Sequence, residues 1–179
     1  MSTSCSSSDC PQRYIFLDAE FTSLRRPALL SLAMVDNTEN WFYGETDLTT
    51  APKSLVRRVG TFARAHVVPQ FGLLPRCAAP LDVIAKRACD WLNAYQPERL
   101  FIAYDFSVDY DLLERLLLMS SQPLAAVLTP THVAYLADDA DGARAAAFSY
   151  EDSARIGLHR HHALADALAL YARFNAVHG

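Results

Sequence analysis

The first apolar segment of the chain carries two carboxylates, Asp18 and Glu20, that are two residues apart. The surrounding run RYIFLDAEF (13–21) is apolar and continuous, which predicts a central strand buried on both faces. Side chains at i and i+2 of a strand share a face, so the two acids would lie side by side. Repulsion between them favours a bound cation, and divalent cations prefer oxygen ligands. The pair indicates a metal site, unless the strand has already ended and both acids face water.

A third carboxylate, Asp109, lies in SVDYDLLERLLLM (107–119), whose apolar spacing predicts a helix. Leucines follow it at i+3, i+4, i+7 and i+8, so Asp109 belongs to the apolar face. Asp111 falls roughly 200° further around the helix and should face water. Asp105 precedes the expected N-cap, Ser107. Asp109 is therefore the best ligand candidate of the three, although an acid in the first turn also complements the helix dipole.

A fourth carboxylate, Asp166, is the one charged residue between positions 163 and 171, inside a predicted helix over 163–174. An ionised acid in so apolar a helix needs a partner, and a shared metal would be one. His162 lies at i−4 and would share the helix face of Asp166. His161 reaches the same place only from the loop before the helix, where it would suit a general base. The spacing does not choose between them, and an exposed polar helix start is the alternative.

Charge is unevenly distributed along the chain, whose formal net charge is −4. The stretch between Asp47 and Asp82 has no acidic residue. It carries a charge of +5, which leaves −9 on the remainder, and its basic residues are Lys53, Arg57, Arg58, Arg64 and Arg76. Such asymmetry is typical of a surface that contacts phosphates. A solvated helix face or a subunit contact is the alternative.

The remaining segments predict a mixed α/β fold. Apolar runs at 28–36 and 40–46 predict a hairpin, and 99–104 predicts a fourth strand. Helical spacing extends over 81–95, while 131–137 fits either a short fifth strand or a helix. The basic stretch, broken by prolines, is expected to be partly helical and partly loop. This order predicts an α/β sandwich around a mixed five-stranded sheet flanked by helices.

Length and composition fit one domain, predicted over 13–179 after a disordered leader over 1–12. No apolar run approaches the roughly 20 residues of a membrane helix. The N-terminus has neither the basic start nor the apolar core of a secretory signal. The four cysteines form no CxxC pair. We therefore expect no membrane partner and a reducing, cytoplasmic location.

Three of these segments together resemble the DEDDh branch of the DEDD exonuclease superfamily. The family's DxE motif matches FLDAEFTSL (16–24), and its helical Asp matches IAYDFSVDYDLL (102–113). Its HxALxDA consensus matches HHALADA (161–167) at every fixed position, which selects His161 as the family's histidine. The motifs look most like those of small bacterial 3′–5′ exoribonucleases, and the resemblance implies a ribonuclease H-like fold. The chain departs from the family at Asp105, where many relatives carry Asn.

The resemblance implies phosphodiester hydrolysis with two divalent metal ions, Mg²⁺ or Mn²⁺. Asp18 would serve both ions. Glu20 and Asp166 would complete the shell of one ion, and Asp109 would hold the other largely through water. His161 would accept a proton from the attacking water. The products would be nucleoside 5′-monophosphates released from the 3′ end of single-stranded RNA or DNA, with RNA favoured.

By their position in the family, the residues after DxE line the pocket for the terminal nucleotide; here these are Phe21, Thr22 and Leu24. Asp105 would add charge or change the substrate contacts beside them. The basic stretch would guide the rest of the strand through Arg57, Arg58 and Arg64. Because relatives are often homodimers, the chain is a candidate homodimer. Two other functions fit the same residues: a non-catalytic nucleic-acid-binding module with this fold, and a metal phosphohydrolase acting on small nucleotides.

Overall fold

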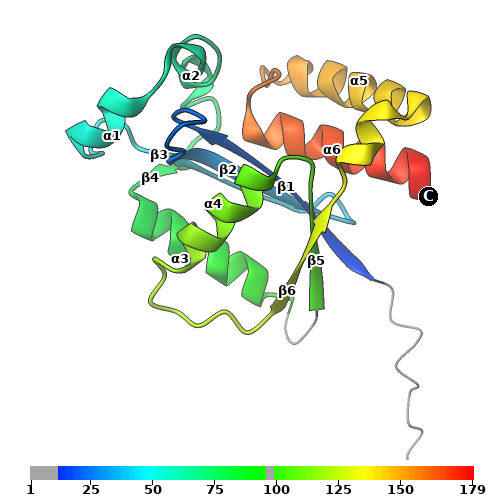
Figure 1. Cartoon of the computed structure of the whole chain (residues 1–179), viewed down its shortest axis with the longest axis horizontal. Helices are drawn as coiled ribbons and strands as arrows, with labels where there is room; N and C mark the ends of the chain where they lie inside the picture. Colours follow the sequence, from blue (N-terminus) through cyan, green and yellow to red (C-terminus); the bar gives the residue numbers. More distant parts are fainter. Residues whose placement is uncertain (1–11, 96–98) are drawn as a thin grey trace, which may run out of the picture.

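The computed structural model describes residues 12–95 and 99–179, in which helices cover both faces of one mixed sheet (Figure 1). The strands are β1 (Arg13–Phe21), β2 (Leu29–Asp36), β3 (Trp41–Thr46), β4 (Ala78–Ala79), β5 (Arg99–Tyr104) and β6 (Val127–His132). Their order in the sheet is β4-β3-β2-β1-β5-β6. β1, β2 and β3 pair antiparallel, whereas β4 pairs parallel with β3, β5 with β1 and β6 with β5. The first apolar run is therefore a central strand, as predicted.

Helices form a layer on each face of this sheet. They are α1 (Lys53–Arg58), α2 (Thr61–His66), η1 (Val68–Gln70), α3 (Leu81–Asn93), α4 (Ser107–Leu117), η2 (Ala134–Asp138), α5 (Ala140–Arg155) and α6 (Ala163–His178). α3 and α4 cover one face, and α6 covers the other with α5 packed on it (Figure 1). Just before α2, the N–H of Gly60 donates to the carbonyl of Thr22 at 2.8 Å, so α2 begins beside the turn that follows β1.

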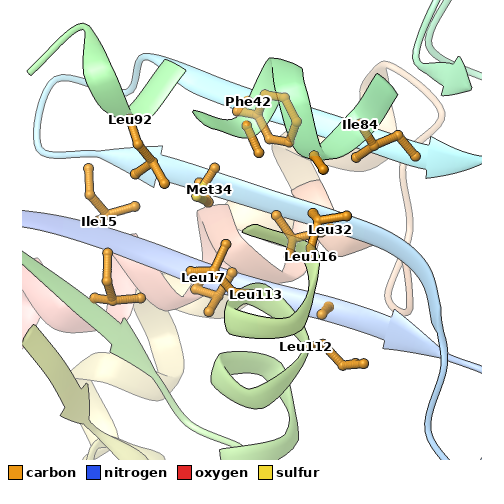
Figure 2. Close-up of a cluster of buried hydrophobic side chains, with 14 of the residues drawn as sticks. Ile15, Leu17, Leu32, Met34, Phe42, Ile84, Leu92, Leu112, Leu113 and Leu116 are labelled. Atoms are coloured by element: carbon orange, nitrogen blue, oxygen red, sulfur yellow. The ribbon is translucent and has the colours of Figure 1, made fainter. Parts of the chain in front are cut away.

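Alternate residues of β1 contribute to two separate cores. Ile15 and Leu17 are fully buried among residues of α3 and α4 (Figure 2), whereas Phe16 is buried on the α6 side. The apolar face of α4 enters the first core through Leu112, Leu113 and Leu116. Each fully buried leucine removes enough apolar surface from water to stabilise the fold by about 1.5–3 kcal/mol. This packing confirms the predicted helix face and brings the N-terminus of α4 against β1.

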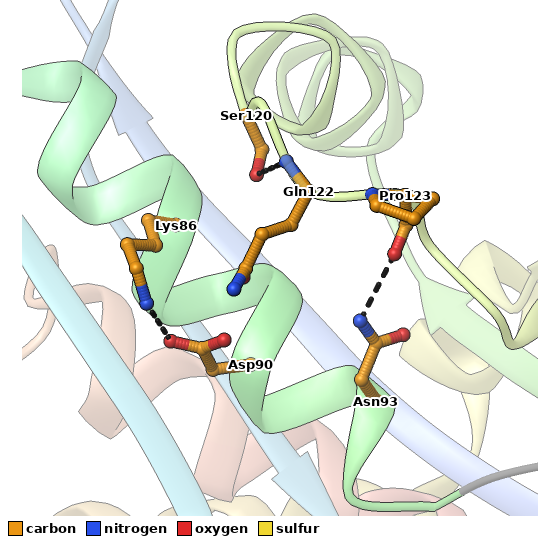
Figure 3. A network of polar contacts seen from close by, with 6 residues as sticks. All are labelled: Lys86, Asp90, Asn93, Ser120, Gln122 and Pro123. Carbon is orange, nitrogen blue, oxygen red and sulfur yellow. Dashed lines mark hydrogen bonds and ion pairs between the residues drawn. The ribbon is translucent and has the colours of Figure 1, made fainter.

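Polar contacts join α3 to the loop after α4 (Figure 3). The side chain of Asn93 donates to the carbonyl of Pro123 at 3.1 Å and accepts from the N–H of Ala125 at 2.9 Å. In the same loop the hydroxyl of Ser120 accepts from the N–H of Gln122 at 3.1 Å. These bonds fix the C-terminal end of α4. The helix is thus held by the sheet along its apolar face and by α3 at its end.

The sheet has one strand more than the predicted five. β4 is only two residues long and lies in the proline-broken basic stretch, so it leaves no alternation to detect. The ambiguous segment 131–137 contains the end of β6 and most of η2, because β6 begins earlier and includes Pro130. Proline is tolerated there because β6 is an edge strand. α5, which the sequence analysis did not delimit, completes the layer with α6.

The remaining expectations concern the N-cap of α4, the leader, the domain bounds and membrane helices. The N-cap of α4 is Phe106 rather than Ser107, and it makes no side-chain cap hydrogen bond. The predicted leader over 1–12 lies outside the described residues except for Gln12, and the single domain over 13–179 stays a prediction. Within the described part of the chain, none of the helices combines the length and apolar character needed to cross a membrane.

Candidate active site

The ends of β1 and β5 and the starts of α4 and α6 surround a cavity of about 430 Å³. β1 and β5 are parallel, so their carboxyl ends meet at one edge of the sheet, and the helices bring their own acids to that edge. The cavity is lined by the five acids Asp18, Glu20, Asp105, Asp109 and Asp166, and by His161. The structure therefore gathers in one place the four predicted ligands, the predicted base and the acid at the family's Asn position.

Possible ligand atoms in this cavity fall into two groups, in each of which they lie within 4.8 Å of one another. The first group is Glu20, His161 and Asp166, and the second is Asp18, Asp105 and Asp109. Carboxylate oxygens dominate both groups, which is the donor set that Mg²⁺ and Mn²⁺ prefer. Asp105 thus lies among the possible ligands beside Asp109, which the helix spacing favoured over it.

Burial and mutual repulsion raise the pKa of these carboxyl groups. Burial is the larger cause for Asp18, whose pKa is well above its ordinary range, and the charges of Asp166 and Asp109 add to it. Burial together with Asp166 raises the pKa of Glu20 to about 8. Burial together with Asp105 raises the pKa of Asp109 to about 8. At neutral pH the cluster therefore favours any added positive charge, whether a proton or a metal ion.

One oxygen of Asp18 has no internal partner. Asp18 Oδ2 is buried and accepts no hydrogen bond within the described residues. A buried carboxylate oxygen without a donor is costly, and native structures rarely leave one unpaired without a reason. A divalent cation between the two ligand groups would satisfy this oxygen and relieve the repulsion among its neighbours. The residues present therefore fit such an ion.

Asp166 receives two hydrogen-bond donors from the protein. The hydroxyl of Tyr150 donates to Oδ1 at 2.5 Å, and the backbone N–H of His161 donates to Oδ2 at 2.9 Å. Burial raises the pKa of Asp166, while these two bonds oppose the shift. Sequence reasoning missed Tyr150, since it lies on α5 and no spacing relates it to Asp166. These donors orient the carboxylate toward the cavity before any ion arrives.

The two neighbouring histidines have separate roles. His162 is the N-cap of α6; it is buried and stacked on Tyr43 with ring centroids 4.6 Å apart, and its Nδ1 accepts from the N–H of Leu164 at 3.3 Å. Burial lowers the pKa of His162 to about 4, so its ring is neutral. His161 precedes the helix, has a left-handed backbone (φ 66°) and lines the cavity. Sequence spacing did not choose between the two histidines, and the loop conformation places His161, not His162, in the cavity lining.

The three residues expected at the terminal nucleotide line a second pocket of about 490 Å³, which shares Phe21 and Phe62 with the first. Phe21 is stacked on Phe106 with centroids 6.2 Å apart, and Leu24 is 72 % exposed. Thr22 is buried, and its hydroxyl donates to the carbonyl of Arg26 and accepts from the N–H of Ala28, each at 3.2 Å. Thr22 therefore shapes the turn, while the exposed apolar surface comes from the residues around it.

The three predicted strand-guiding arginines lie outside both pockets. Arg64 donates to the carbonyls of Val59 and Val56 at 2.9 and 3.1 Å, so it caps the end of α1. Arg58 donates to the carbonyl of Arg26 at 2.5 Å. Arg57, in the last turn of α1, is exposed. Two of the three guanidinium groups thus have intramolecular structural partners.

Two other arginines line the cavity itself, and sequence reasoning proposed neither. The guanidinium of Arg160 lies 4.7 Å from the centre of the Tyr150 ring. Arg173 of α6 is 4.0 Å from Asp105 Oδ2, and within residues 12–95 and 99–179 its buried Nε has no hydrogen-bond partner. Basic side chains beside a carboxylate cluster allow a site to hold cations and a phosphate together.

No model of a known protein family matches the chain, and no curated protein matches it.

Proposed function

We propose that this protein is a metal-dependent 3′–5′ exonuclease of the DEDDh type with a ribonuclease H-like fold. It releases nucleoside 5′-monophosphates from the 3′ end of single-stranded nucleic acid, with RNA favoured over DNA. The observation that carries the proposal is the meeting of Asp18, Glu20, Asp109, Asp166 and His161 in one cavity. Their ligand atoms form two adjoining groups, as a two-metal centre requires.

The carboxylates are the ligands in this proposal. Asp18, whose buried Oδ2 has no hydrogen-bond partner among the described residues, would serve both ions. Glu20 and Asp166 would hold one ion, and Asp109 would hold the other with Asp105 beside it. When bound, two Mg²⁺ or Mn²⁺ ions acidify the attacking water and stabilise the leaving 3′-oxyanion. The protein keeps these ligands on rigid elements, since β1 is a central strand and α4 and α6 pack on the sheet.

His161 is the general base. A ring nitrogen of His161 belongs to the same group of possible ligand atoms as Glu20 and Asp166, so the ring would reach a water bound at that group. The bond from its backbone N–H to Asp166 Oδ2 couples the position of the base to that of a metal ligand. The step performed by this residue is the removal of one proton from the water that attacks the phosphorus.

The terminal base binds in the second pocket, where Phe21, Leu24 and Phe62 offer an apolar surface beside the acids. Stacking of bases on such side chains is insensitive to sequence, because every base has a π-face. Arg57, Arg58 and Arg64 do not line the cavity of the acids, whereas Arg160 and Arg173 do. They are suited to the phosphate, and exposed arginines such as Arg57 are suited to the remaining strand.

The direct experiment follows Mg²⁺- or Mn²⁺-dependent release of mononucleotides from 5′-labelled RNA and DNA oligonucleotides. The wild type should shorten the strand one nucleotide at a time and stop when the metal is chelated. Asp18→Asn should lose activity by on the order of 10³-fold or more, the usual cost of removing a central catalytic group. Equal activity of wild type and Asp18→Asn would contradict the proposal. Hydrolysis of small nucleotides alone would favour a phosphohydrolase, and binding without turnover would favour a non-catalytic module.

A further inference from the structure

Gln70 joins two segments that are far apart in the sequence. It is the last residue of η1, and its side chain is buried. Its Nε2 donates to the carbonyl of His66 at 2.9 Å and to the carbonyl of Arg160 at 2.8 Å. Its Oε1 accepts from the N–H of His159 at 3.0 Å. One amide group thus bonds the end of α2 to the loop between α5 and α6, using both of its donors and its acceptor.

The bond from Gln70 to Arg160 acts on a single peptide group. The carbonyl of Arg160 and the N–H of His161 belong to the same planar unit. Gln70 binds the carbonyl side of that unit, and Asp166 accepts from the N–H side at 2.9 Å. A planar group held at both edges cannot rotate without breaking one of these bonds. The backbone from which the His161 side chain extends is therefore fixed by one core residue and one metal-ligand candidate.

His161 needs such restraint because its backbone is left-handed, with φ at 66°. A side-chain-bearing residue rarely adopts this conformation, which persists where the surroundings over-determine it. The same segment that carries Gln70 also meets the ring. Phe62 of α2 lies edge-on to the His161 ring with centroids 4.8 Å apart, and His66 lies 5.8 Å from it. Backbone and ring of His161 are thus both in contact with residues 61–70.

We propose that Gln70 is a positioning residue for His161, acting through the Arg160–His161 peptide group. This inference rests on the proposed function for its catalytic consequence, since it assigns His161 the role of base. Residues 61–70, which are part of the basic stretch, then also orient the base. Substrate binding does not need Gln70, because its amide is buried and lines neither of the two pockets at the site.

The test uses Gln70→Glu and Gln70→Ala in the full chain. Glu keeps the shape of the side chain but has no N–H to donate to the two carbonyls. We expect kcat to fall by about 10- to 100-fold, the scale of a small misplacement of a catalytic group, with KM nearly unchanged. In a His161→Ala background the same substitutions should cause no further loss, since residues that act as one unit are non-additive. An equal loss in both backgrounds would overturn the proposal.

Thr46→Val is the matched control. Thr46 is buried, its hydroxyl donates to the carbonyl of Leu29 at 3.1 Å, and it lines neither of the two pockets at the site. The substitution removes a buried hydrogen bond while keeping side-chain shape, so it reports the effect of lost stability alone. We expect kcat of this variant to match wild type at a temperature where both are folded. A drop like that of Gln70→Glu would mean that stability explains both results.

A second measurement does not depend on nuclease activity. In the metal-free protein, hydrogen exchange at the His161 amide should be about 10-fold faster in Gln70→Glu than in wild type, because the loop opens more often. In Thr46→Val, the exchange rate at the His161 amide should be unchanged relative to the rates of neighbouring amides in the same loop. Unchanged protection at His161 in Gln70→Glu would overturn the proposal. If the wild type shows no nuclease activity but exchange at the His161 amide is faster in Gln70→Glu, Gln70 still holds the His161 backbone and the proposed function fails.

Discussion

Two aspartates on adjacent strands differ in the hydrogen-bond donors that reach their carboxylates. Asp36, at the end of β2, is 2 % exposed, and its Oδ1 accepts from the N–H and hydroxyl of Thr38 at 2.7 and 2.8 Å and from the N–H of Asn40 at 2.9 Å. Its Oδ2 accepts from the hydroxyl of Tyr95 at 2.8 Å. Burial acts to raise its pKa, but these bonds outweigh it and leave the pKa below the ordinary value.

Asp18, on β1, has no donor to its Oδ2 among the residues that the structure describes, and it lies near other acids. Burial and those charges both raise its pKa. The chain therefore satisfies both oxygens of Asp36, which serves the fold, and leaves Oδ2 of Asp18 in the candidate site without a donor among the described residues. A cation stabilises an unpaired carboxylate oxygen of this kind, so the difference suits a cation site.

The largest effect expected from this comparison is on Asp36. Asp36→Ala leaves the donors of Thr38, Asn40 and Tyr95 without their acceptor, which should cost roughly 3 kcal/mol of unfolding free energy. For a chain of this size that corresponds to a fall in Tm of about 6–12 °C. Chemical denaturation and thermal melting measure the loss. Nuclease activity below the melting range should stay at the wild-type level, and a selective loss of activity would place Asp36 in the site.

Cation binding should give the next largest effect. At a free Mn²⁺ concentration of 100 Kd, a single site that exists only in the folded state stabilises by about 2.7 kcal/mol. The wild type should therefore gain about 5–10 °C in Tm. Asp36→Asn, which keeps an acceptor oxygen, should gain as much, whereas Asp18→Asn should gain far less. An equal gain in Asp18→Asn would mean that the ion binds elsewhere.

In the metal-free protein, the stability contributed by the acids around Asp18 and the stability contributed by Asp36 should depend on pH in opposite ways. Glu20 and Asp109 have folded pKa values of about 8, well above their unfolded values, so the folded state binds more protons. Their contribution is full below the unfolded values and is lost as pH rises through about 4 to 8. Asp36 has a lowered folded pKa, so its contribution is lost only as pH falls below its unfolded value. Metal-free Tm should decline between pH 5 and 8, and saturating Mn²⁺ should remove the decline.

A carboxylate outside both environments should give the smallest effect. Asp90 pairs with Lys86 at 2.8 Å on the exposed side of α3 (Figure 3). Exposed pairs of this kind are worth about 0.2–1 kcal/mol, and i,i+4 helix pairs about 0.3–0.5. Lys86→Ala should therefore change the unfolding free energy by no more than about 0.5 kcal/mol. A larger loss, measured by urea denaturation, would show that charge removal itself destabilises this fold and would weaken the interpretation of Asp36→Ala.

Sequence reasoning succeeded where a single segment holds the information. The apolar run around Asp18 predicted a central strand, and the leucines after Asp109 predicted its buried helix face; both predictions are confirmed. Periodicity within a segment suffices for these because the sheet simply buries the apolar face. The position of His161 needed a left-handed backbone that no periodicity encodes.

The remaining site residues depend on contacts between distant segments. Tyr150 reaches Asp166 from a different helix, and Gln70 reaches Arg160 across 90 residues of sequence. Such contacts follow from how the layers pack, so no spacing in one sequence predicts them. β4 was missed for a related reason, since two residues become a strand only by pairing with β3. The arginines were the least predictable, because Arg64 looks the same in sequence whether it caps a helix or contacts a substrate.

The site draws its groups from opposite ends of the described chain: Asp18 and Glu20 lie on β1, whereas His161 and Asp166 arrive with α6. During synthesis, the ribosome finishes the whole sheet before it makes α6, and folding proceeds from the N-terminal side. On the proposed function, a chain that ends before His161 therefore lacks Asp166 and the base, although Asp18, Glu20 and Asp109 are already present. On the proposed function, activity would therefore begin only when the segment from His161 through α6 has docked on the sheet.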